Sequence, residues 1–358
     1  SFFKKTKPMQ LLALPPAVLG KVLKQLTPLQ IFELSQSSMR MPTLIKSIMA
    51  FDRILIDLTK ERKSIIFYNN WEREPAIFFH VDYKPDVYDT KLKIGKLRIT
   101  MTDGHLHCYT KRPGSCLKLC LDFFFTIFHC RSGLATVKLD GHASKFRRLI
   151  FHPIFNNRLV LKLCGGTLKR GYNDMKTLLH EYEHLEGIVV DFQFRIDYFD
   201  PTEIFTRNRV CFINGDWITC DILLRLNFTR LVLASHKLTT QDMNAFIRSW
   251  VSGYCPNLQR FEVFHNNNSG FHPKHIIQGL DIQGWHPERR HENVVMDFLE
   301  CPYIMKARDE IDVRRRKDGM LATIVNKPKS FMFVVWHERF PEYNPKYRVT
   351  SKHVPVNF

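Results

Sequence analysis

The segment LLHEYEHLEG, from Leu178 to Gly187, contains the residue types of a zinc hydrolase. His180, Glu181 and His184 fit the pattern H-E-x-x-H, in which two histidines one helical turn apart hold zinc and the glutamate activates water. A zincin also needs its histidines in the middle of a helix that faces a cleft, and a third ligand from elsewhere in the chain. Here a strand-like run follows His184 almost at once, so we expect the two histidines on the last turn of a helix.

Histidines near the end of a helix also have a purely electrostatic use, because positive charge there interacts favourably with the helix dipole. The extended zincin pattern H-E-x-x-H-x-x-G-x-x-H is absent. Glu203 has a tolerable spacing for a third ligand, but it follows Asp200–Pro201 and can simply cap a turn. We therefore expect no catalytic residue, no metal ligand and no cofactor, and we keep a zinc hydrolase that uses HEYEH as an alternative function.

Composition indicates an ordinary globular chain. Its 358 residues, 44% hydrophobic and 25% charged, are enough for one large domain or two to three smaller ones. No apolar run reaches the roughly 18 to 20 residues of a membrane helix, and we expect no secretory signal. The run LDFFFTIF, Leu121 to Phe128, is expected to be a buried strand. Nine scattered cysteines without a C-x-x-C pair indicate a reduced, intracellular protein, in the cytoplasm, the nucleus or both.

The formal net charge of +18 favours acidic partners in general. The basic residues are spread along the whole chain, and the densest cluster, Arg314 to Lys317, falls in an expected hairpin. A nucleic-acid-binding protein is therefore a second alternative function, although charge alone does not make it the expected one.

Three short helices are expected in the first fifty residues. Apolar residues recur from Val18 to Leu26 at the i, i+3, i+4, i+7 spacing of an amphipathic helix. Pro16 suits its first turn, Thr27–Pro28 ends it and begins a second helix, and a third begins after Met41–Pro42. Such short helices cannot bury all of their apolar surface among themselves. The remainder either marks a partner site or packs on the following domain as ordinary core.

The same residues resemble a known family. The segment LLALPPAVLGKVLKQLTPLQIFELSQSSMRMPTLIK is similar to an F-box in the spacing of its leucines, its prolines and its helix breaks. In that family the segment docks on the Skp adaptor of a Skp–cullin–F-box ubiquitin ligase. Gln30 stands where the family usually has an acidic residue, which implies weaker polar contacts but an intact helix. The adaptor-binding residues that the resemblance implies are Leu12, Leu14, Pro15, Val18, Leu19, Val22, Leu23, Leu26, Pro28, Ile31 and Leu34.

Farther along the chain, apolar triplets with the spacing L-x-x-L-x-L recur at irregular separations. They are Phe51/Ile54/Ile56, Ile94/Leu97/Ile99, Phe146/Leu149/Phe151, Leu185/Ile188/Val190, Phe228/Leu231/Leu233 and Leu258/Phe261/Val263. Between the last two triplets lies a helix that Thr239 or Thr240 caps and Gly253 ends. This repetition predicts a leucine-rich-repeat-like α/β solenoid, in which each repeat buries its apolar face against the next. An unrelated α/β fold with the same strand rhythm is the alternative.

Two further segments resemble the type-2 F-box-associated domain that follows the F-box in a large nematode family. The first runs from Asp216 to Phe264. The second, DEIDVRRRKDGMLATIVNKPKSFMFVVW, contains the pattern D-I-x-R-x-x-D-G-x-x-A-T-I that recurs in that family. Asp318–Gly319 is also a strong hairpin signal between alternating strands, and Phe331 to Trp336 adds a third strand.

The expected fold class is α/β, with an N-terminal three-helix F-box, an irregular leucine-rich-repeat-like α/β domain and a C-terminal antiparallel hairpin or meander. The expected boundaries are 9–50 for the F-box, 51–265 for the repeat-like region with its F-box-associated resemblance at 200–265, 266–340 for the β-rich part and 341–358 for a tail. The resemblance implies a non-enzymatic substrate-recognition subunit. Its partners would be a Skp-type adaptor, through it a cullin, and an unidentified protein target whose binding residues are unknown; no membrane or nucleic-acid partner is expected.

Overall fold

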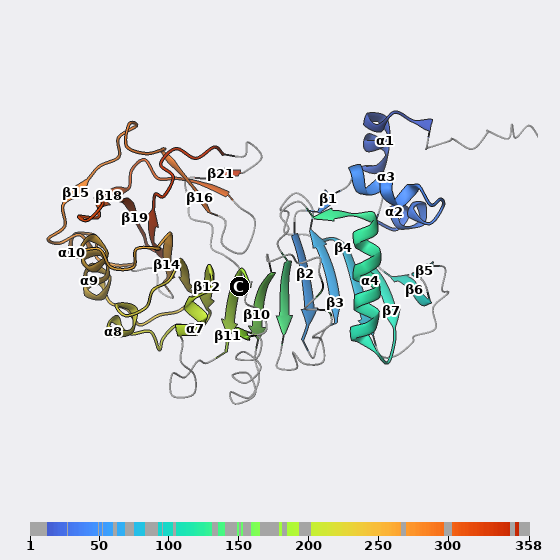
Figure 1. Ribbon diagram of the computed structural model, residues 1–358, viewed down its shortest axis with the longest axis horizontal. Coiled ribbons are helices and arrows are strands. Elements are labelled where there is room, and N and C mark those ends of the chain that lie inside the picture. Colours follow the sequence, from blue (N-terminus) through green and yellow to red (C-terminus); the bar gives the residue numbers. More distant parts are fainter. Residues whose placement is uncertain are drawn as a thin grey trace, which may run out of the picture. The chain divides into compact units, whose positions relative to one another are not determined.

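The computed structural model divides the chain into two compact units (Figure 1). The N-terminal unit comprises Ser1–Val137 and Lys145–Asn156, and the C-terminal unit comprises Lys138–Ser144 and Asn157–Phe358. The boundaries expected at residues 50 and 265 do not coincide with this division, and they stay predictions. The residues that the structure describes are 13–26, 28–48, 50–51, 53–59, 63–68, 75–82, 92–94, 96–102, 105–130, 135–139, 149, 152, 159–164, 179–180, 185–192, 202–265, 270–296, 303–343 and 348–350.

The first helices of the structure lie where the sequence predicts them. They are α1 (Pro16–Leu23), α2 (Pro28–Ser35) and α3 (Met41–Ile48). Pro16 occupies the first turn of α1, where its missing N–H costs no hydrogen bond. The helices α1 and α3 approach closely at Gly20, where a Cβ atom would lie 3.3 Å from Cγ2 of Ile48. A Cβ atom at position 20 would therefore require the side chain of Ile48 to shift by about a few tenths of an ångström.

A sheet follows these helices in the N-terminal unit. Its strands, in the order in which neighbours pair, are β2 (Arg53–Leu58), β3 (Ser64–Tyr68), β4 (Pro75–Asp82), β7 (His105–Tyr109), β6 (Leu97–Thr102) and β5 (Leu92–Ile94). Strands β4 and β7 pair in parallel, whereas the other neighbours in this series are antiparallel. Ile94, Leu97 and Ile99 therefore belong to an antiparallel hairpin, so their prediction as one repeat strand is wrong. A separate parallel pair joins β1 (Ala50–Phe51) to β8 (His129–Cys130).

The aromatic run from Leu121 to Phe128 is helical, so the prediction of a buried strand is wrong. All but its last residue lie in α4 (Pro113–Ile127). Phe124 packs against Phe67 of β3 and Phe79 of β4, with ring centroids 5.0 and 5.9 Å apart. The physical reason is that the apolar period begins before the aromatic run and has helical spacing. The buried residues of α4 are Cys116, Leu117, Cys120, Leu121, Phe124 and Ile127.

The C-terminal unit begins its sheet with parallel strands. In pairing order they are β10 (Leu159–Cys164), β11 (Gly187–Asp191), β12 (Arg209–Phe212), β13 (Arg230–Leu233) and β14 (Arg260–Phe264). Helices α7 (Thr202–Phe205), α8 (Cys220–Leu223) and α9 (Thr240–Val251) lie between these strands in the chain. The triplets around Ile188, Leu231 and Phe261 lie on these strands in matching register, but the triplet around Leu149 falls mostly outside the described residues. A complete solenoid stays a prediction. Strand β9 (Ala135–Leu139) contains the first passage of the chain between the units.

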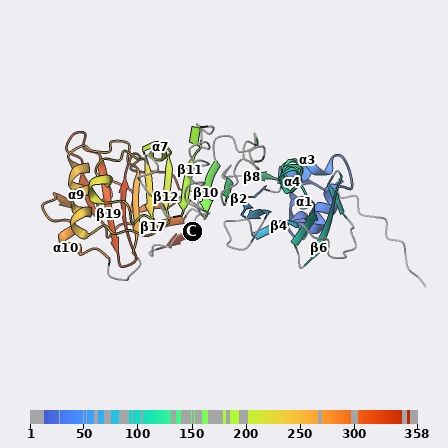
Figure 2. The ribbon, with the colours of Figure 1, turned by 90° about the horizontal axis from the view of Figure 1, so that it is seen from below.

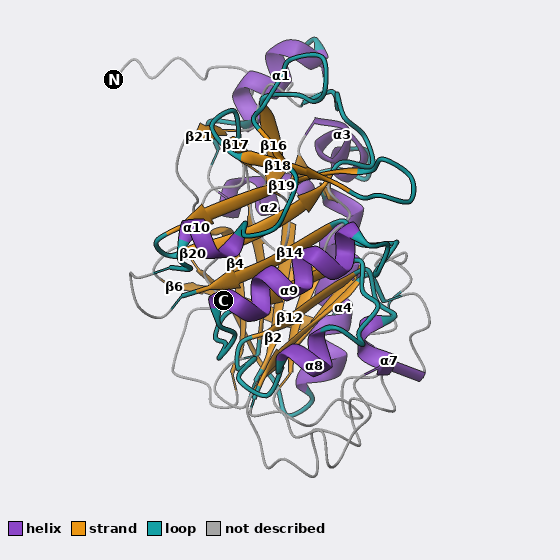
Figure 3. Cartoon of the chain, turned by 90° about the vertical axis from the view of Figure 1, so that its left-hand side faces the viewer, coloured by secondary structure: helices purple, strands orange, loops and turns teal. Residues whose placement is uncertain are grey.

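Helix α9 confirms the strand–helix–strand order predicted for this region. Thr239 caps it, because its Oγ1 accepts the backbone N–H of Asp242 at 3.2 Å while Oδ2 of Asp242 accepts the backbone N–H of Thr239 at 2.8 Å. Gly253 follows the helix with φ at +111°, a conformation that favours glycine. Figure 3 shows α9 across the strands of the sheet, and Phe246 contacts Phe261 of β14 with ring centroids 5.0 Å apart.

Antiparallel strands continue the sheet from β14. In pairing order they are β20 (Ser330–Val335), β19 (Leu321–Lys327), β18 (Ile311–Arg314) and β15 (Ile282–Gln283). The predicted turn at Asp318–Gly319 is confirmed between β18 and β19. Gly319 has φ at +71°, and Oδ1 of Asp318 accepts the backbone N–H of Met320 at 3.0 Å. The short helix α10 (Pro273–Ile276) precedes β15 in the chain.

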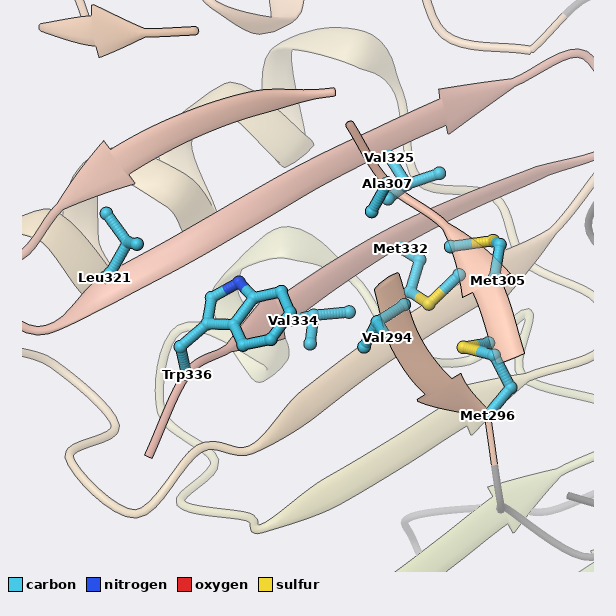
Figure 4. Packing of buried hydrophobic residues seen from close by; sticks show 9 residues of the cluster. All are labelled: Val294, Met296, Met305, Ala307, Leu321, Val325, Met332, Val334 and Trp336. Carbon is cyan, nitrogen blue, oxygen red and sulfur yellow. The ribbon is translucent and has the colours of Figure 1, made fainter. Parts of the chain in front are cut away.

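A second, smaller sheet packs on these antiparallel strands. Its described strands are β16 (Asn293–Met296), β17 (Tyr303–Lys306) and β21 (Arg348–Thr350). Figure 4 shows the apolar layer between the two sheets, where methionine side chains from β16, β17 and β20 meet, and Val294 and Val334 lie between them and the indole of Trp336. The buried residues of this layer are Val294, Met296, Met305, Ala307, Leu321, Val325, Met332, Val334 and Trp336.

Candidate functional site

The residues predicted to bind an adaptor divide into a buried set and a surface set. Leu19, Leu23 and Ile31 are at most 3% exposed, so they hold the helices together. Leu12 lies outside the described residues, and Pro28 is described only by its place at the start of α2. Among the predicted residues whose burial is described, only those that are wholly or partly exposed can contact a partner directly. These are Leu14, Pro15, Val18, Val22, Leu26 and Leu34.

Part of the surface set forms a line along α1. Val18 and Val22 lie four residues apart on α1, so they share one face of the helix, and Leu14 and Pro15 lie directly before its first residue. Val18, in the middle, is 44% exposed. We call Leu14, Pro15, Val18 and Val22 the α1 strip. An apolar strip on a helix whose other face is buried has the form that enters a hydrophobic groove of a partner.

The α1 strip stands on a fixed base, because α2 and α3 pack on α4. Phe32 of α2 contacts Phe123 of α4 with ring centroids 5.2 Å apart. Lys46 of α3 donates from Nζ to the backbone carbonyl oxygen of Phe125 at 2.7 Å, and Figure 2 shows α3 and α4 side by side. Phe32 therefore packs on the following residues as core, whereas the α1 strip stays at the surface, where its role as a partner site stays a prediction.

The charges of this helical region are mostly positive. The described residues between positions 13 and 48 include one acidic and four basic side chains, and all five are exposed. Exposed charges of one sign favour a partner surface of the opposite sign. The charged residues are Lys21, Lys24, Glu33, Arg40 and Lys46.

The H-E-x-x-H segment has no ligand set in the described part of the chain. Leu179 and His180 are helical, with Leu179 buried and His180 exposed, whereas Glu181 and His184 lie outside the described residues. Glu203, the third ligand that was considered, lies exposed in the first turn of α7. Among the described residues, no group of three or more His, Cys, Asp or Glu side chains could hold a metal ion in the arrangement that they adopt.

Sequence reasoning missed a buried ion pair in the C-terminal unit. Arg290 and Asp312 are both 0% exposed, and Nε of Arg290 donates to the two carboxylate oxygens of Asp312 at 2.9 and 3.0 Å. Burial lowers the pKa of Arg290, while the Asp312 carboxylate acts in the opposite direction. Thr323 Oγ1 donates to Asp312 Oδ1 at 2.7 Å, and Trp336 Nε1 donates to Thr323 Oγ1 at 2.7 Å. These hydrogen bonds explain why an aspartate and a threonine stand at two positions of the D-I-x-R-x-x-D-G-x-x-A-T-I pattern, which Asp312 and Thr323 occupy.

The basic cluster from Arg314 to Lys317 is not a continuous basic surface. Arg315 is 4% exposed, and its guanidinium lies over the ring of Trp250 at 5.2 Å. The same guanidinium donates to Asp318 at 2.6 to 3.1 Å and holds the pKa of that carboxyl at about 2. Part of the cluster therefore stabilises the turn at Gly319, and it gives little support to a nucleic-acid interface.

Two histidines meet beyond the ends of the parallel strands β13 and β14. Nε2 of His236 and Nδ1 of His265 lie 3.1 Å apart, so one of these nitrogens donates its proton to the other. Phe271 packs on both rings, with centroid distances of 5.6 and 4.5 Å. Burial lowers the pKa of His236, and burial together with the neighbouring His236 lowers the pKa of His265 to about 4. The folded protein therefore keeps His265 neutral through the mildly acidic range.

Acid is expected to destabilise the C-terminal unit through His265. Between pH 6.5 and about 4 the unfolded chain binds a proton at this residue that the folded chain does not bind, so the free energy of unfolding falls as the pH falls. Each pKa unit corresponds to about 1.4 kcal/mol, so the loss by pH 4 is on the order of 3 kcal/mol. Urea unfolding across this pH range measures it. His265→Gln should show a flatter pH dependence, and a slope equal to that of the wild type would contradict the assignment.

Comparison with protein families supports one of the two resemblances. Residues 200–263 match the F-box associated family. This segment runs from α7 into β14 and so contains the capped helix α9 and the parallel strands on either side of it. It does not include α1, α2 and α3, whose identity as an F-box stays a prediction.

Two proteins of Caenorhabditis elegans are similar to parts of the chain. E3 ubiquitin-protein ligase hecw-1 is 31% identical over 81 residues, which are 23% of this chain and 6% of that protein. Uncharacterized protein F59B2.8 is 25% identical over 130 residues, which are 35% of this chain and 29% of that protein. The chain thus covers less than a third of either relative. No solved structure is significantly similar to it.

No helix in the described part of the chain is long and apolar enough to span a membrane.

Proposed function

We propose that the chain is a substrate-recognition subunit of a Skp–cullin–F-box ubiquitin ligase. The N-terminal helices would bind a Skp-type adaptor and, through it, a cullin, while the C-terminal unit would hold a protein target. The observation that carries the proposal is the match of residues 200–263 to the F-box associated family. A subunit of this kind binds and positions its partners, so the proposal requires no catalytic residue of its own.

The α1 strip supports the adaptor half of the proposal. Val18 and Val22 are apolar side chains at the surface of α1, whereas Leu19 and Leu23 of the same helix are buried. Partners that recognise a helix commonly bind such a face in an apolar groove, and a few central side chains carry most of the binding energy.

The charge of the helical region predicts the charge of the partner surface. Exposed basic side chains surround the α1 strip in sequence, and only Glu33 opposes them. The rim of the partner surface should therefore be acidic, since complementary charge speeds encounter and disfavours wrong partners. Association with the adaptor is then expected to slow as ionic strength rises, because surface charges are screened over about 8 Å at physiological salt.

The test is affinity purification of the tagged full chain from cells with a blocked proteasome, followed by mass spectrometry. The expected result is that a Skp-type adaptor and a cullin are recovered together, with a target protein that accumulates when the chain is depleted. Recovery of a target without adaptor or cullin would overturn the ligase role but leave an interaction module. Recovery of neither adaptor nor cullin from cells that express both would overturn the proposal.

A further inference from the structure

Three cysteine thiols lie close together between β7 and α4 in the N-terminal unit. Cys108 lies on β7, and Cys116 and Cys120 lie one turn apart on α4. All three are at most 2% exposed, and each is a thiol in the structure. The proposed ligase role uses none of them.

Cys108 and Cys116 are in contact through their sulfur atoms. The two Sγ atoms lie 3.4 Å apart, whereas a disulfide bond is about 2.05 Å long. A shortening of about 1.4 Å would therefore convert the contact into a bond. The two residues lie 8 positions apart in the chain, so this bond would close a short loop inside one unit.

Cys120 is a poorer partner for Cys116 than Cys108 is. Residues four positions apart on a helix hold their Cβ atoms about 5 to 6 Å apart, but a disulfide needs about 3.5 to 4.5 Å. A bond between Cys116 and Cys120 would thus distort α4. Cys108 and Cys116 lie on separate elements, and the residues that connect these elements, 110–112, are exposed or half-buried. This pair can therefore adjust its geometry at the surface.

The start of α4 is weakly held. Its N-cap residue, Arg112, makes no side-chain capping hydrogen bond, and the second residue of the helix is Gly114. An uncapped end and a glycine each lower the stability of a helix. The backbone N–H of Cys116 donates to the carbonyl oxygen of Arg112 at 3.1 Å. Fraying of this turn would expose Cys116, while Cys120 would stay in the helix one turn farther on.

Reaction of the buried thiols requires such an opening. The hydrogen bond with Cys108 lowers the pKa of Cys116, but the hydrogen bond with Cys120 and burial raise it, and the resulting pKa is well above the usual value. The thiolate is the reactive form of cysteine, so the closed unit contains almost none of it at Cys116. When the first turn of α4 opens, Cys116 meets water and its pKa returns toward about 8.5.

We propose that Cys108 and Cys116 form a disulfide bond when the chain meets a low-molecular-weight disulfide such as oxidised glutathione. The Cys116 thiolate attacks one sulfur of the reagent, so that a mixed disulfide forms and one glutathione leaves as its thiolate. The Cys108 thiol then loses its proton, and its sulfur attacks the sulfur of Cys116 and releases the second glutathione. In total the two cysteines lose two electrons and two protons, and oxidised glutathione gains them and becomes two molecules of glutathione.

The bond would tie β7 to the helix on which α2 and α3 pack. Phe32 of α2 and Lys46 of α3 both contact α4, at Phe123 and Phe125. Oxidation would therefore stabilise the base of the N-terminal helices. This modification is independent of the proposed ligase role.

The test is incubation of the reduced full chain with oxidised glutathione, followed by blocking of the remaining thiols, digestion with trypsin and mass spectrometry. Trypsin separates the three cysteines into the peptides Ile99–Lys111, Arg112–Lys118 and Leu119–Arg131. The expected result is that the first two peptides are joined, within one chain, by a bond that a reductant breaks. A pair that contains the third peptide instead, a covalent dimer, or recovery of the first two peptides unjoined would each overturn the proposal.

Cys120→Ala is the matched control for Cys116→Ala, because both residues are buried on α4. After the same treatment Cys120→Ala should contain the bond and Cys116→Ala should not. The bond should raise the temperature of thermal unfolding by about 5 to 10 °C in the wild type and in Cys120→Ala, but not in Cys116→Ala. Circular dichroism of the reduced variants establishes that they are folded. No rise in the wild type, or an equal rise in Cys116→Ala, would contradict the proposal.

Discussion

Val18→Asp is expected to weaken binding of the chain to a Skp-type adaptor by at least about 100-fold. Val18 lies in the middle of the α1 strip and is 44% exposed, so a charged side chain is accommodated in the free protein. In the complex the same side chain would enter an apolar groove, where an unpaired carboxylate is costly. Central apolar anchors commonly contribute about 2 kcal/mol or more, and a hundredfold loss of affinity corresponds to about 2.7 kcal/mol. Biolayer interferometry with purified adaptor measures the effect.

Leu119→Asp is the matched control for this substitution. Leu119 lies on α4 in the same unit and is 48% exposed, so the two substitutions are equal in chemistry and nearly equal in exposure. Only Val18→Asp should lose the adaptor. Leu19→Ala serves a different purpose, because Leu19 is buried and its truncation should destabilise the helices by about 2 to 5 kcal/mol. Adaptor affinity that is equal in Val18→Asp and the wild type would contradict docking through the α1 strip.

Asp312→Ala is expected to lower the free energy of unfolding of the C-terminal unit by about 3 to 5 kcal/mol. The substitution leaves the guanidinium of Arg290 fully buried without its carboxylate, and breaking one side of a buried pair costs about this much. It also removes the acceptor of the Thr323 hydroxyl. Chemical denaturation monitored by tryptophan fluorescence measures the change, since the chain has five tryptophans and one of them, Trp336, donates to Thr323 in this network.

Two further variants show whether the loss comes from the unpaired charge. Arg290→Met combined with Asp312→Leu replaces the pair by apolar side chains, and it should recover most of the stability that Asp312→Ala loses. Lys327→Ala removes a half-exposed partner from the ion pair with Glu310 and should cost about 1 kcal/mol or less. If Asp312→Ala unfolds within 1 kcal/mol of the wild type, the network is not a main source of stability.

Features set by neighbouring residues were the ones that the sequence predicted best. The cap at Thr239, the apolar face of α9 and the turn at Asp318–Gly319 all depend on residues within a few positions of one another, and the structure contains each of them. The breaks at Pro16 and at Thr27–Pro28 predicted the first two helices for the same reason. The match of residues 200–263 to the F-box associated family falls on the segment with the strongest local signals.

Features that depend on distant residues were missed or assigned incorrectly. The run LDFFFTIF is too short and too rich in aromatic residues for its own letters to distinguish a strand from a helix, and the apolar spacing of the residues before it decides. Asp312 belongs to a recognised pattern, but its partner Arg290 lies 22 residues away and is charged, a type that is rarely buried. The contact between His236 and His265 was missed for a similar reason, because these two residues lie 29 positions apart in the chain.

The contact between Phe32 and Phe123 has a practical consequence for dissecting the chain. A fragment that ends near residue 50 would keep α1, α2 and α3 but lose α4, and the ring of Phe32 would then face water. Such a peptide should aggregate and be poorly soluble, because it exposes apolar surface. A binding assay with it would then measure aggregation and not specific binding to the adaptor. The smallest piece suitable for work on adaptor binding is therefore the whole N-terminal unit, strands included.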